Sequence, residues 1–360
     1  MKKVVKRDTI LTELEAVIPG LSTRDVIEQS SCFVFSQGEV ITYNGEIACH
    51  HVTSLRKLEG AIQAKPLLNT LRLMSGMEVE IATKDGDLII EGIGKKGQKI
   101  QRRAEIRMDS EIMLPVENIE HPKEWKPLHK NFLDAINLVH QCTGKDENKF
   151  WTTCVHLHPD YIEASDNDQI SRYTLPTSVR RSVLVRGASI KHILTLGFTE
   201  FSETKTWIHF RNGEGLIFSC LRFKHKFPDL SPYLEVKGKK ATFPKLKQAA
   251  KRAEVFSSEN PESNRILVEL QKDGRLRITG EGASGKYVEG KRIKYEGPAI
   301  AFLIAPNLLT ELSSRFKGKC SIAANALKVN GGHFEYVASL GKPGDDEDEG
   351  QQEEEDEEEE

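Results

Sequence analysis

Two glycine-rich runs have the spacing of a phosphate-binding loop. GIGKKG at 92–97 and GEGASG at 280–285 both match GxGxxG. That motif holds a pyrophosphate only where its glycines form a strand-to-helix turn, because the helix N-terminus then meets the phosphate charge. The residues that follow, KIQRRAEIRM and KYVEGKRIKY, have the pattern of strands. We therefore expect both runs to be hairpin turns and not dinucleotide sites.

The second run also approaches a Walker A loop, GxxxxGK. In GEGASGKY, however, Tyr287 stands where a Ser or Thr hydroxyl must bind Mg²⁺. An NTPase would lack its metal ligand at this position. A nucleotide-dependent enzyme is therefore only an alternative, which nucleotide binding at the two glycine turns would reveal.

Side chains that could bind a metal or catalyse a reaction are scattered. His156 and His158 lie on one face of a predicted strand with Asp160 nearby, so they could approach a common metal ion. Alternating histidines on a strand are more often packed or solvated. Asp166 and Asp168 lie two residues apart in a turn region, which is weak support for acid–base catalysis. We therefore expect that the protein is not an enzyme and that it binds neither a metal nor another cofactor.

The elements that would position a site recur along the chain. A strand–turn–strand pattern, with apolar residues alternating on both sides of a polar turn, begins at 33, 155 and 268. A short helix with Leu or Ile at i and i+3 begins at 64, 186 and 305. The starts lie 122 and 113 residues apart for the hairpins, and 122 and 119 apart for the helices. Two unrelated patterns at nearly one interval indicate three similar repeats in tandem.

Each repeat also contains a further helix and further strands. These helices are expected over 8–18, 129–142 and 243–256, and the strands over 78–92, 205–221 and 320–340. Two junctions are rich in proline, which cannot lie inside a central strand or a helix; the prolines are Pro115, Pro122, Pro127, Pro228, Pro232 and Pro244. The predicted class is α+β, with two helices and antiparallel sheets in each domain. The predicted parts are domains over 1–122, 123–240 and 241–342, and a disordered acidic tail over 343–360.

Charge is distributed unevenly along the 360 residues. Residues 345–360 contain 13 carboxylates and no basic residue. Of the 54 Asp and Glu in the chain, 41 remain without this run, against 51 Lys and Arg, so the body has an excess of about ten positive charges. A basic body is expected to bind a polyanion, and the acidic tail to compete for the same surface. A tail that only increases solubility is the alternative.

Cysteine spacing and hydropathy indicate in which cellular compartment the protein is expected. The six cysteines are single and form no CxxC pair, which is typical of reduced thiols and not of a disulfide framework or a zinc ribbon. No run of 18 apolar residues occurs, so no membrane partner is expected. We expect a cytoplasmic protein that is associated with the nucleoid. If the source is a virus, we expect the protein in the cytoplasm of the host.

The chain resembles the bacterial-type DNA sliding clamps, the beta subunits of DNA polymerase III, over about residues 1–340. KFPDLSPYL at 226–234 is similar to the Phe-Pro-Asp segment that leaves the second domain of such clamps. ASDNDQISRY at 164–173 takes the place of a Thr-Asp-Gly-x-Arg-Leu-like stretch. The run from KLKQAAKRAEVFSSEN to LVELQKDGRLRITG has the family's spacing of helix, loop and hairpin.

The resemblance implies the DNA clamp fold and a non-enzymatic processivity factor. Such clamps are head-to-tail homodimeric rings around double-stranded DNA, opened by a clamp loader that hydrolyses ATP, and they tether the replicative DNA polymerase. Twelve inner helices about 9–10 Å apart would leave a bore on the order of 25 Å, enough for a duplex. An acidic-tailed nucleic-acid-binding scaffold or chaperone that closes no ring is the alternative.

A sliding ring must contact phosphates through long, mobile side chains and ignore base edges. Basic residues away from the apolar helix faces suit that role. These candidates for DNA binding are Arg72, Lys191, Lys245, Lys247, Lys251 and Arg252. Three further candidates, Arg24, Lys145 and Lys149, occupy positions where the resembled clamps contact DNA.

The resemblance also implies a peptide pocket between the second and third domains, which receives short linear motifs of polymerase and loader. Matched position by position, the pocket draws on Thr152, Ser165, Asn167, Ile170, Pro228, Tyr233, Val337 and Ser339. The family's Gly-His-Arg-Leu becomes residues 167–170 here, and Ser339 replaces a methionine. We therefore expect a more polar pocket that binds a different peptide, or binds it only in competition with the tail.

Overall fold

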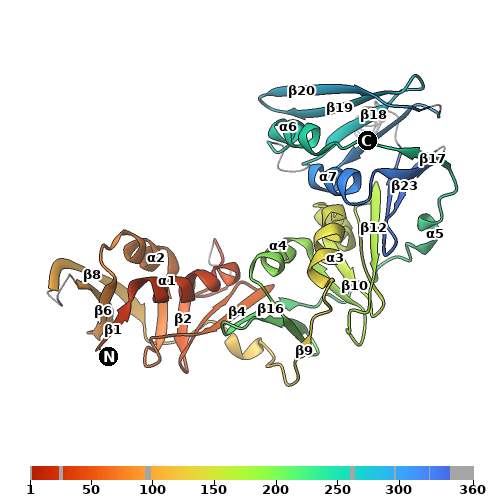
Figure 1. Cartoon of the computed structure of the whole chain (residues 1–360). Coiled ribbons are helices and arrows are strands. Elements are labelled where there is room, and N and C mark those ends of the chain that lie inside the picture. Colours follow the sequence, from red (N-terminus) through yellow and green to blue (C-terminus); the bar gives the residue numbers. More distant parts are fainter. Residues whose placement is uncertain are drawn as a thin grey trace, which may run out of the picture. The chain divides into compact units, whose positions relative to one another are not determined.

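The computed structural model describes residues 2–23, 27–93, 99–259, 264–295, 297–323 and 325–340, apart from the side chains of 99–101. The chain forms two compact units (Figure 1). Unit 1 contains the described residues of Met1–Leu128 and Ala188–Phe223, and unit 2 contains those of His129–Gly187 and Lys224–Glu360. Arg24 and the acidic tail predicted over 343–360 lie outside the described residues. The division of 1–342 into three domains stays a prediction.

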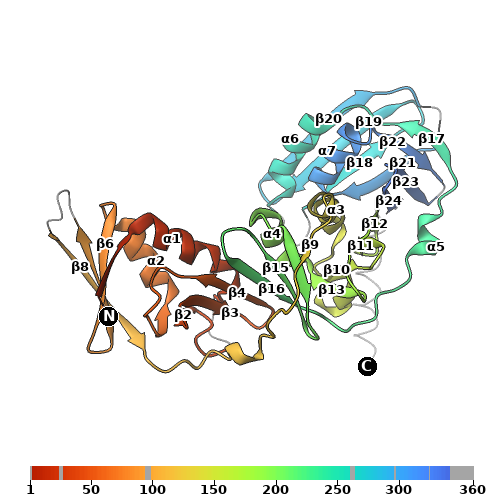
Figure 2. The same ribbon diagram turned by 60° about the horizontal axis from the view of Figure 1, so that its bottom comes forward.

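Unit 1 is built on a twelve-stranded antiparallel sheet, ordered β1-β6-β7-β8-β5-β2-β3-β4-β16-β15-β14-β9. Its strands are β1 (Lys2–Lys6), β2 (Cys32–Ser36), β3 (Glu39–Tyr43), β4 (Ile47–Val52), β5 (Gly60–Gln63), β6 (Glu78–Lys84), β7 (Asp87–Ile93), β8 (Lys99–Asp109), β9 (Lys126–Pro127), β14 (Glu200–Glu203), β15 (Trp207–Arg211) and β16 (Leu216–Leu221). Its α-helices are α1 (Arg7–Ala16), α2 (Ala64–Leu73) and, from Ala188 onward, α4 (Gly187–Thr195). Helices α1 and α2 lie side by side (Figures 1 and 2).

Unit 2 contains two antiparallel sheets, ordered β13-β10-β11-β12-β24-β23-β22-β17 and β20-β19-β18-β21. The strands are β10 (Cys154–Leu157), β11 (Tyr161–Ser165), β12 (Gln169–Thr174), β13 (Val183–Arg186), β17 (Lys239–Thr242), β18 (Ile266–Leu270), β19 (Arg275–Gly282), β20 (Gly285–Arg292), β21 (Ile300–Ile304), β22 (Lys319–Ile322), β23 (Ala326–Asn330) and β24 (Phe334–Ser339). The α-helices are α3 (Phe132–Val139), α5 (Ser231–Leu234), α6 (Lys247–Ser257) and α7 (Pro306–Ser314). Helix α3 packs on β11 and β12, while α6 lies against α7 and the four-stranded sheet.

The predicted α+β class is confirmed. The three predicted hairpins are β2–β3, β10–β11 and β18–β19, and each is antiparallel. Helices occur in all six predicted places, with ends that differ by a few residues. Helix α5 contradicts the expectation that proline excludes a helix from the second junction. Pro232 lies in the first turn, where its missing N–H is harmless, and Asp229 Oδ1 accepts the N–H of Ser231 at 2.9 Å.

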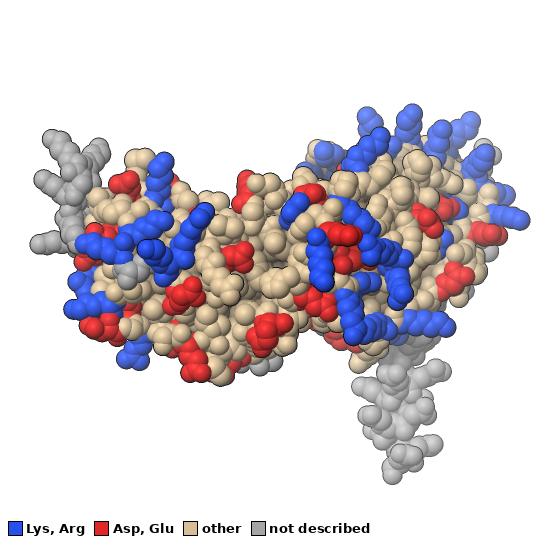
Figure 3. Space-filling view, turned by 90° about the horizontal axis from the view of Figure 1, so that it is seen from below, with Lys and Arg blue, Asp and Glu red and all other residues tan. Residues whose placement is uncertain are grey.

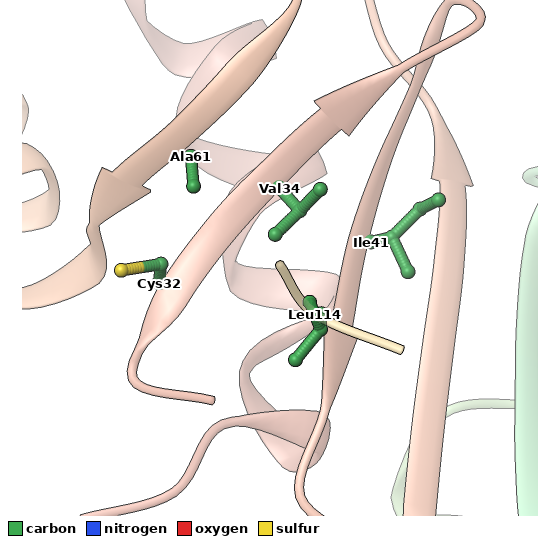
Figure 4. Close-up of a cluster of buried hydrophobic side chains, with 5 residues drawn as sticks. All are labelled: Cys32, Val34, Ile41, Ala61 and Leu114. Atoms are coloured by element: carbon green, nitrogen blue, oxygen red, sulfur yellow. The ribbon is translucent and has the colours of Figure 1, made fainter. Parts of the chain in front are cut away.

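The core of unit 1 occupies both faces of β2. Cys32 and Val34 pack with Ile41, Ala61 and Leu114 in one buried cluster (Figure 4). The intervening residues of the strand are phenylalanines and are likewise fully buried. A strand covered on both faces has apolar residues at successive positions, as β2 does. Cys32 therefore acts as a small apolar side chain within this core.

The remaining cysteines are used in the same way. All six are buried, and none forms a disulfide. Burial raises the pKa of the Cys49 thiol to about 12, which keeps it protonated and unreactive near neutral pH. None of the described helices has the length and hydropathy needed to cross a membrane.

The second glycine motif is part of a hairpin, as predicted. Gly280 and Gly282 lie on β19, which turns directly into β20. A Cβ on Gly280 would come within 2.0 Å of the Ala253 carbonyl oxygen, and one on Gly282 within 2.1 Å of that of Phe256. Both glycines therefore allow the backbone of α6 to pack directly on the strand. The first motif, at 92–97, falls mostly outside the described residues, but the residues after it form strand β8 as expected.

Replacing Gly280 with Ala should destabilise the protein by about 1–3 kcal/mol, because the new methyl group meets helix backbone that cannot rotate away. Gly290→Ala on neighbouring β20 is the matched control, since its Cβ would find its closest neighbour, the Leu276 carbonyl oxygen, at 3.8 Å. The control should change the free energy of unfolding by less than about 0.5 kcal/mol. Urea titrations of both variants measure the difference. Equal effects would contradict the proposed packing role.

Candidate peptide and nucleic-acid sites

Two paired strands bring part of the predicted peptide set together. In the β12–β24 pair, Ile170 lies directly opposite Val337. Both side chains are buried, and they pack against Leu230 and Leu234 from the segment around α5. These two leucines are not among the predicted site residues, although their i, i+4 spacing in KFPDLSPYL places them on one side of a helical turn. The apolar part of the predicted site is thus filled by the chain's own side chains.

The other predicted peptide residues lie around this cluster. Pro228 is half-buried in the segment that leads into α5, next to Phe227, which packs against the cluster. Tyr233 of α5 is 65% exposed, and Ser339 at the end of β24 is exposed as well. Ser165 is buried, and its Oγ accepts the N–H of Asn167 at 3.3 Å. An exposed aromatic ring beside an apolar cluster is a common anchor for a bound peptide.

A polar pocket joins the remaining predicted residues. Thr152 and Asn167 line an open pocket of about 640 Å³ together with Lys145, Lys149 and Arg265. The pocket therefore combines two residues of the predicted peptide set with both lysines of the predicted DNA-binding loop. Its further lining residues are Gly144, Asp146, Glu147, Asp166 and Asp168. This side of the turn between β11 and β12 is polar, and peptide binding there stays a prediction.

An ion pair between distant parts of the chain fixes this turn. Arg265 forms ion pairs with Asp166, whose side chain is only 2% exposed, and with Asp168 at 3.2 Å. Asp166 Oδ1 also accepts the N–H groups of Asp168 and Gln169 at 3.1 and 3.0 Å. Between them Asn167 has φ of +84°, a conformation that asparagine tolerates better than most residues. Burial raises the pKa of the Asp166 carboxyl, and the Arg265 charge acts against that rise.

The histidines considered as metal ligands have other partners. His156 Nδ1 lies 2.8 Å from Glu163 Oε1, and the imidazole stacks on Phe227 with the ring centres 4.6 Å apart. Arg172 donates to the other oxygen of Glu163 from Nε at 2.8 Å and from Nη2 at 2.6 Å. Arg172 Nη1 also reaches Ser231 Oγ at 3.2 Å. This buried network holds the segment that leads into α5 against the eight-stranded sheet. Among the described residues, no group of three or more His, Cys, Asp or Glu could hold a metal ion.

The basic residues predicted to bind DNA fall into two classes. Lys247 and Lys251 are exposed on α6, while Ala249, Ala250 and Ala253 face the core. Lys191 on α4 and Lys245 before α6 are exposed too. The two helix arginines, by contrast, are engaged in ion pairs, Arg72 with Glu15 at 2.8 Å and Arg252 with Glu289. The four lysines named here are therefore exposed, so that their charge can reach a polyanion.

Solved structures share this architecture, although no family model and no curated protein matches the sequence. The DNA polymerase III beta chain of Streptococcus pneumoniae matches with a TM-score of 0.71 at 17% identity, over 95% of this chain and 99% of that one. A Pseudomonas aeruginosa sliding clamp matches with a TM-score of 0.69 at 15% identity, again over 95% and 99%. The beta subunit of Thermotoga maritima gives 0.68 at 13% identity with the same coverage. The chain has the sliding-clamp fold.

The resemblance to the DNA sliding clamps, which the sequence indicates, is thus confirmed at the level of the fold. The clamp fold places the KFPDLSPYL segment against β12 and β24, so the residues quoted for the resemblance do meet in space. The roles of the individual site residues stay predictions.

Replacing Arg265 with Met should destabilise the protein by about 2–4 kcal/mol at pH 7, because Asp166 then stays buried without its counter-charge. The loss of Arg265 also raises the pKa of Asp166 further. The folded state then gains protons before the unfolded state does as the pH falls. The free energy of unfolding of the variant should therefore increase as the pH falls from neutral toward the pKa of the unfolded carboxyl.

Urea unfolding at pH 7 and about pH 5 measures this recovery. Adding Asp166→Asn to the Arg265 variant should remove the pH dependence. Arg275→Met is the matched control, because its pair with Asp273 is exposed and screened by solvent, so its loss should change the stability far less than the loss of Arg265 does. A loss that is independent of pH, and that persists in the double variant, would show that the ion pair is not responsible.

Proposed function

We propose that this chain is a DNA polymerase processivity clamp, which encircles double-stranded DNA and tethers the replicative polymerase through the site beside β12 and β24. The observation that supports this most is the sliding-clamp fold over 95% of the chain. Such a function is topological, so it needs neither a catalytic group nor a cofactor. The buried carboxylates Asp166 and Glu163 agree with this, because each is bound to an arginine of its own chain.

The proposal includes a head-to-tail homodimer, for which each unit offers a sheet edge. Strand β8 pairs with β7 over 99–107, and in the described part of the chain its other side pairs with β5 only at Met108 and Asp109. Strand β20 is the last strand of the four-stranded sheet. Edge strands present N–H and C=O groups that can pair with another chain. Two such heterologous interfaces would close a ring on a two-fold axis.

We assign the DNA contacts chiefly to lysines. Lys247 and Lys251 lie one turn apart on α6, and no ion pair reaches them within the described residues. Long ammonium side chains on a helix can contact phosphates without reading bases, which a sliding protein requires. The further proposed partners are a clamp loader, which would open the ring, and peptide motifs of loader and polymerase. The proposed location is the cytoplasm, where such partners act on DNA.

Reversing the charge at both Lys247 and Lys251 should weaken duplex binding and flatten its salt dependence. Each phosphate contact contributes about 0.9 to the slope of log affinity against log salt, so the slope should fall by about 2 per chain. Fluorescence anisotropy with a labelled duplex at several salt concentrations measures it. Arg252→Gln on the same helix is the control, and its effect should be smaller because Arg252 is bound to Glu289 and Tyr287. An unchanged slope in the double variant would contradict the assigned contacts.

Encirclement itself is tested by retention on DNA after loading. A closed ring should stay on a circular duplex in high salt, and it should leave once a restriction enzyme linearises the circle. Topological linkage, unlike charge contact, is not screened by salt. The alternative, an acidic-tailed scaffold or chaperone without a ring, should dissociate equally from both forms. Sedimentation of the free protein then shows whether a dimer accompanies retention.

A further inference from the structure

A lysine-lined groove shares no lining residue with the polar pocket described above. It is an open hollow of about 800 Å³ in unit 2, and its walls include Lys237, Lys239, Lys272, Pro298, Ile322 and Ala323. Strand β17 forms one wall and is the last strand of the eight-stranded sheet. The turn between β18 and β19 supplies Lys272. The groove therefore lies at the end of the β17–β22 pair, where Lys239 is opposite Ile322.

Within the described part of the chain, the lining of this groove contains three lysines and no acidic residue. Lys237, Lys239 and Lys272 are all exposed, and among the described residues none of them forms an ion pair. Asp273, next to Lys272, has its carboxylate engaged by Arg275 at 2.7 Å. In unit 2, Lys and Arg side chains also stand out over the surface at the right of Figure 3. Three uncompensated ammonium groups in one hollow favour an anionic occupant.

The chain leaves its last strand beside this groove. Strand β24 ends at Ser339, and the N–H of Leu340 donates to the Asn325 carbonyl at 3.0 Å. Asn325 belongs to the β22–β23 connection, whose first residue, Ala323, lines the groove. Residues 341–344 can span about 14 Å and the acidic run 345–360 about 58 Å, at up to about 3.6 Å per residue. The acidic run therefore begins within reach of the three lysines.

We propose that the acidic segment 345–360 docks in the groove of Lys237, Lys239 and Lys272 in its own chain. Thirteen carboxylates within 16 residues supply the complementary charge. Their number exceeds that of the lysines, so the docked segment needs no unique register and keeps free carboxylates along its length. Docking is electrostatic and weakens as salt screens it. While the segment is docked in the groove, it is not free to contact the lysines that we propose bind DNA.

Zero-length carbodiimide coupling on the full-length protein tests the location, because it joins only carboxylates and lysines in contact. Mass spectrometry should place most links from 345–360 on Lys237, Lys239 and Lys272. Their yield should fall at least about fivefold between about 0.05 M and 0.5 M salt, as the screening length shrinks. A mixture of isotope-labelled and unlabelled chains should give links within one chain. Links chiefly to Lys245, Lys247 or Lys251, or chiefly between labelled and unlabelled chains, would overturn the proposal.

A second measurement does not need the lysines as coupling sites. A Glu-specific protease should remove the segment at least about threefold faster from the K237Q/K239Q/K272Q variant than from the parent, because cleavage follows the undocked population. The control K57Q/K123Q/K205Q changes three exposed lysines of unit 1 and should be cleaved at the parent rate. Equal rates in all three proteins would also overturn the proposal. Neither assay contains DNA or polymerase, so the result is independent of the proposed clamp function.

Discussion

Main-chain hydrogen bonding between strands far apart in the sequence is the constraint on which the rest of this structure depends. In unit 1, β4 pairs with β16, from Ile47 opposite Cys220 to His51 opposite Leu216. In unit 2, β12 pairs with β24. Each pairing satisfies N–H and C=O groups that would otherwise form an exposed edge. Short sheets thereby become the continuous twelve- and eight-stranded sheets of the two units.

The candidate peptide site is a consequence of the second pairing. It sets Ile170 beside Val337, and it ties the β11–β12 turn to the end of β24 through the Ser339 N–H, which donates to the Asp168 carbonyl at 2.6 Å. The segment that carries α5 is then attached by packing and by the Arg172 network. Because all of these contacts lie within one chain, the surface of the candidate site is formed without a bound partner.

Electrostatics divides the basic residues into structural and available ones. Arginines with fixed carboxylate partners, such as Arg172 and Arg265, hold distant segments together, since the guanidinium group can donate to several acceptors at once. The lysines of α6 and of the β17 groove are exposed and carry their charge into solvent. Net charge alone could not reveal this division, because it counts a buried ion-paired arginine and a solvated lysine equally.

Local sequence patterns determined the hairpins, the six predicted helices and the rejection of the second glycine motif, because alternation, helical spacing and turn residues act over a few neighbours. Only tertiary structure decided which strand edges pair, that Leu230 and Leu234 fill the apolar cluster, and that Arg265 neutralises Asp166 from 99 residues away. Such contacts depend on where the folded backbone brings distant segments, and no short-range pattern encodes that. Gly280 illustrates both contributions. The glycine motif is visible in the sequence, but the need for glycine at this position comes from the helix backbone that packs against it.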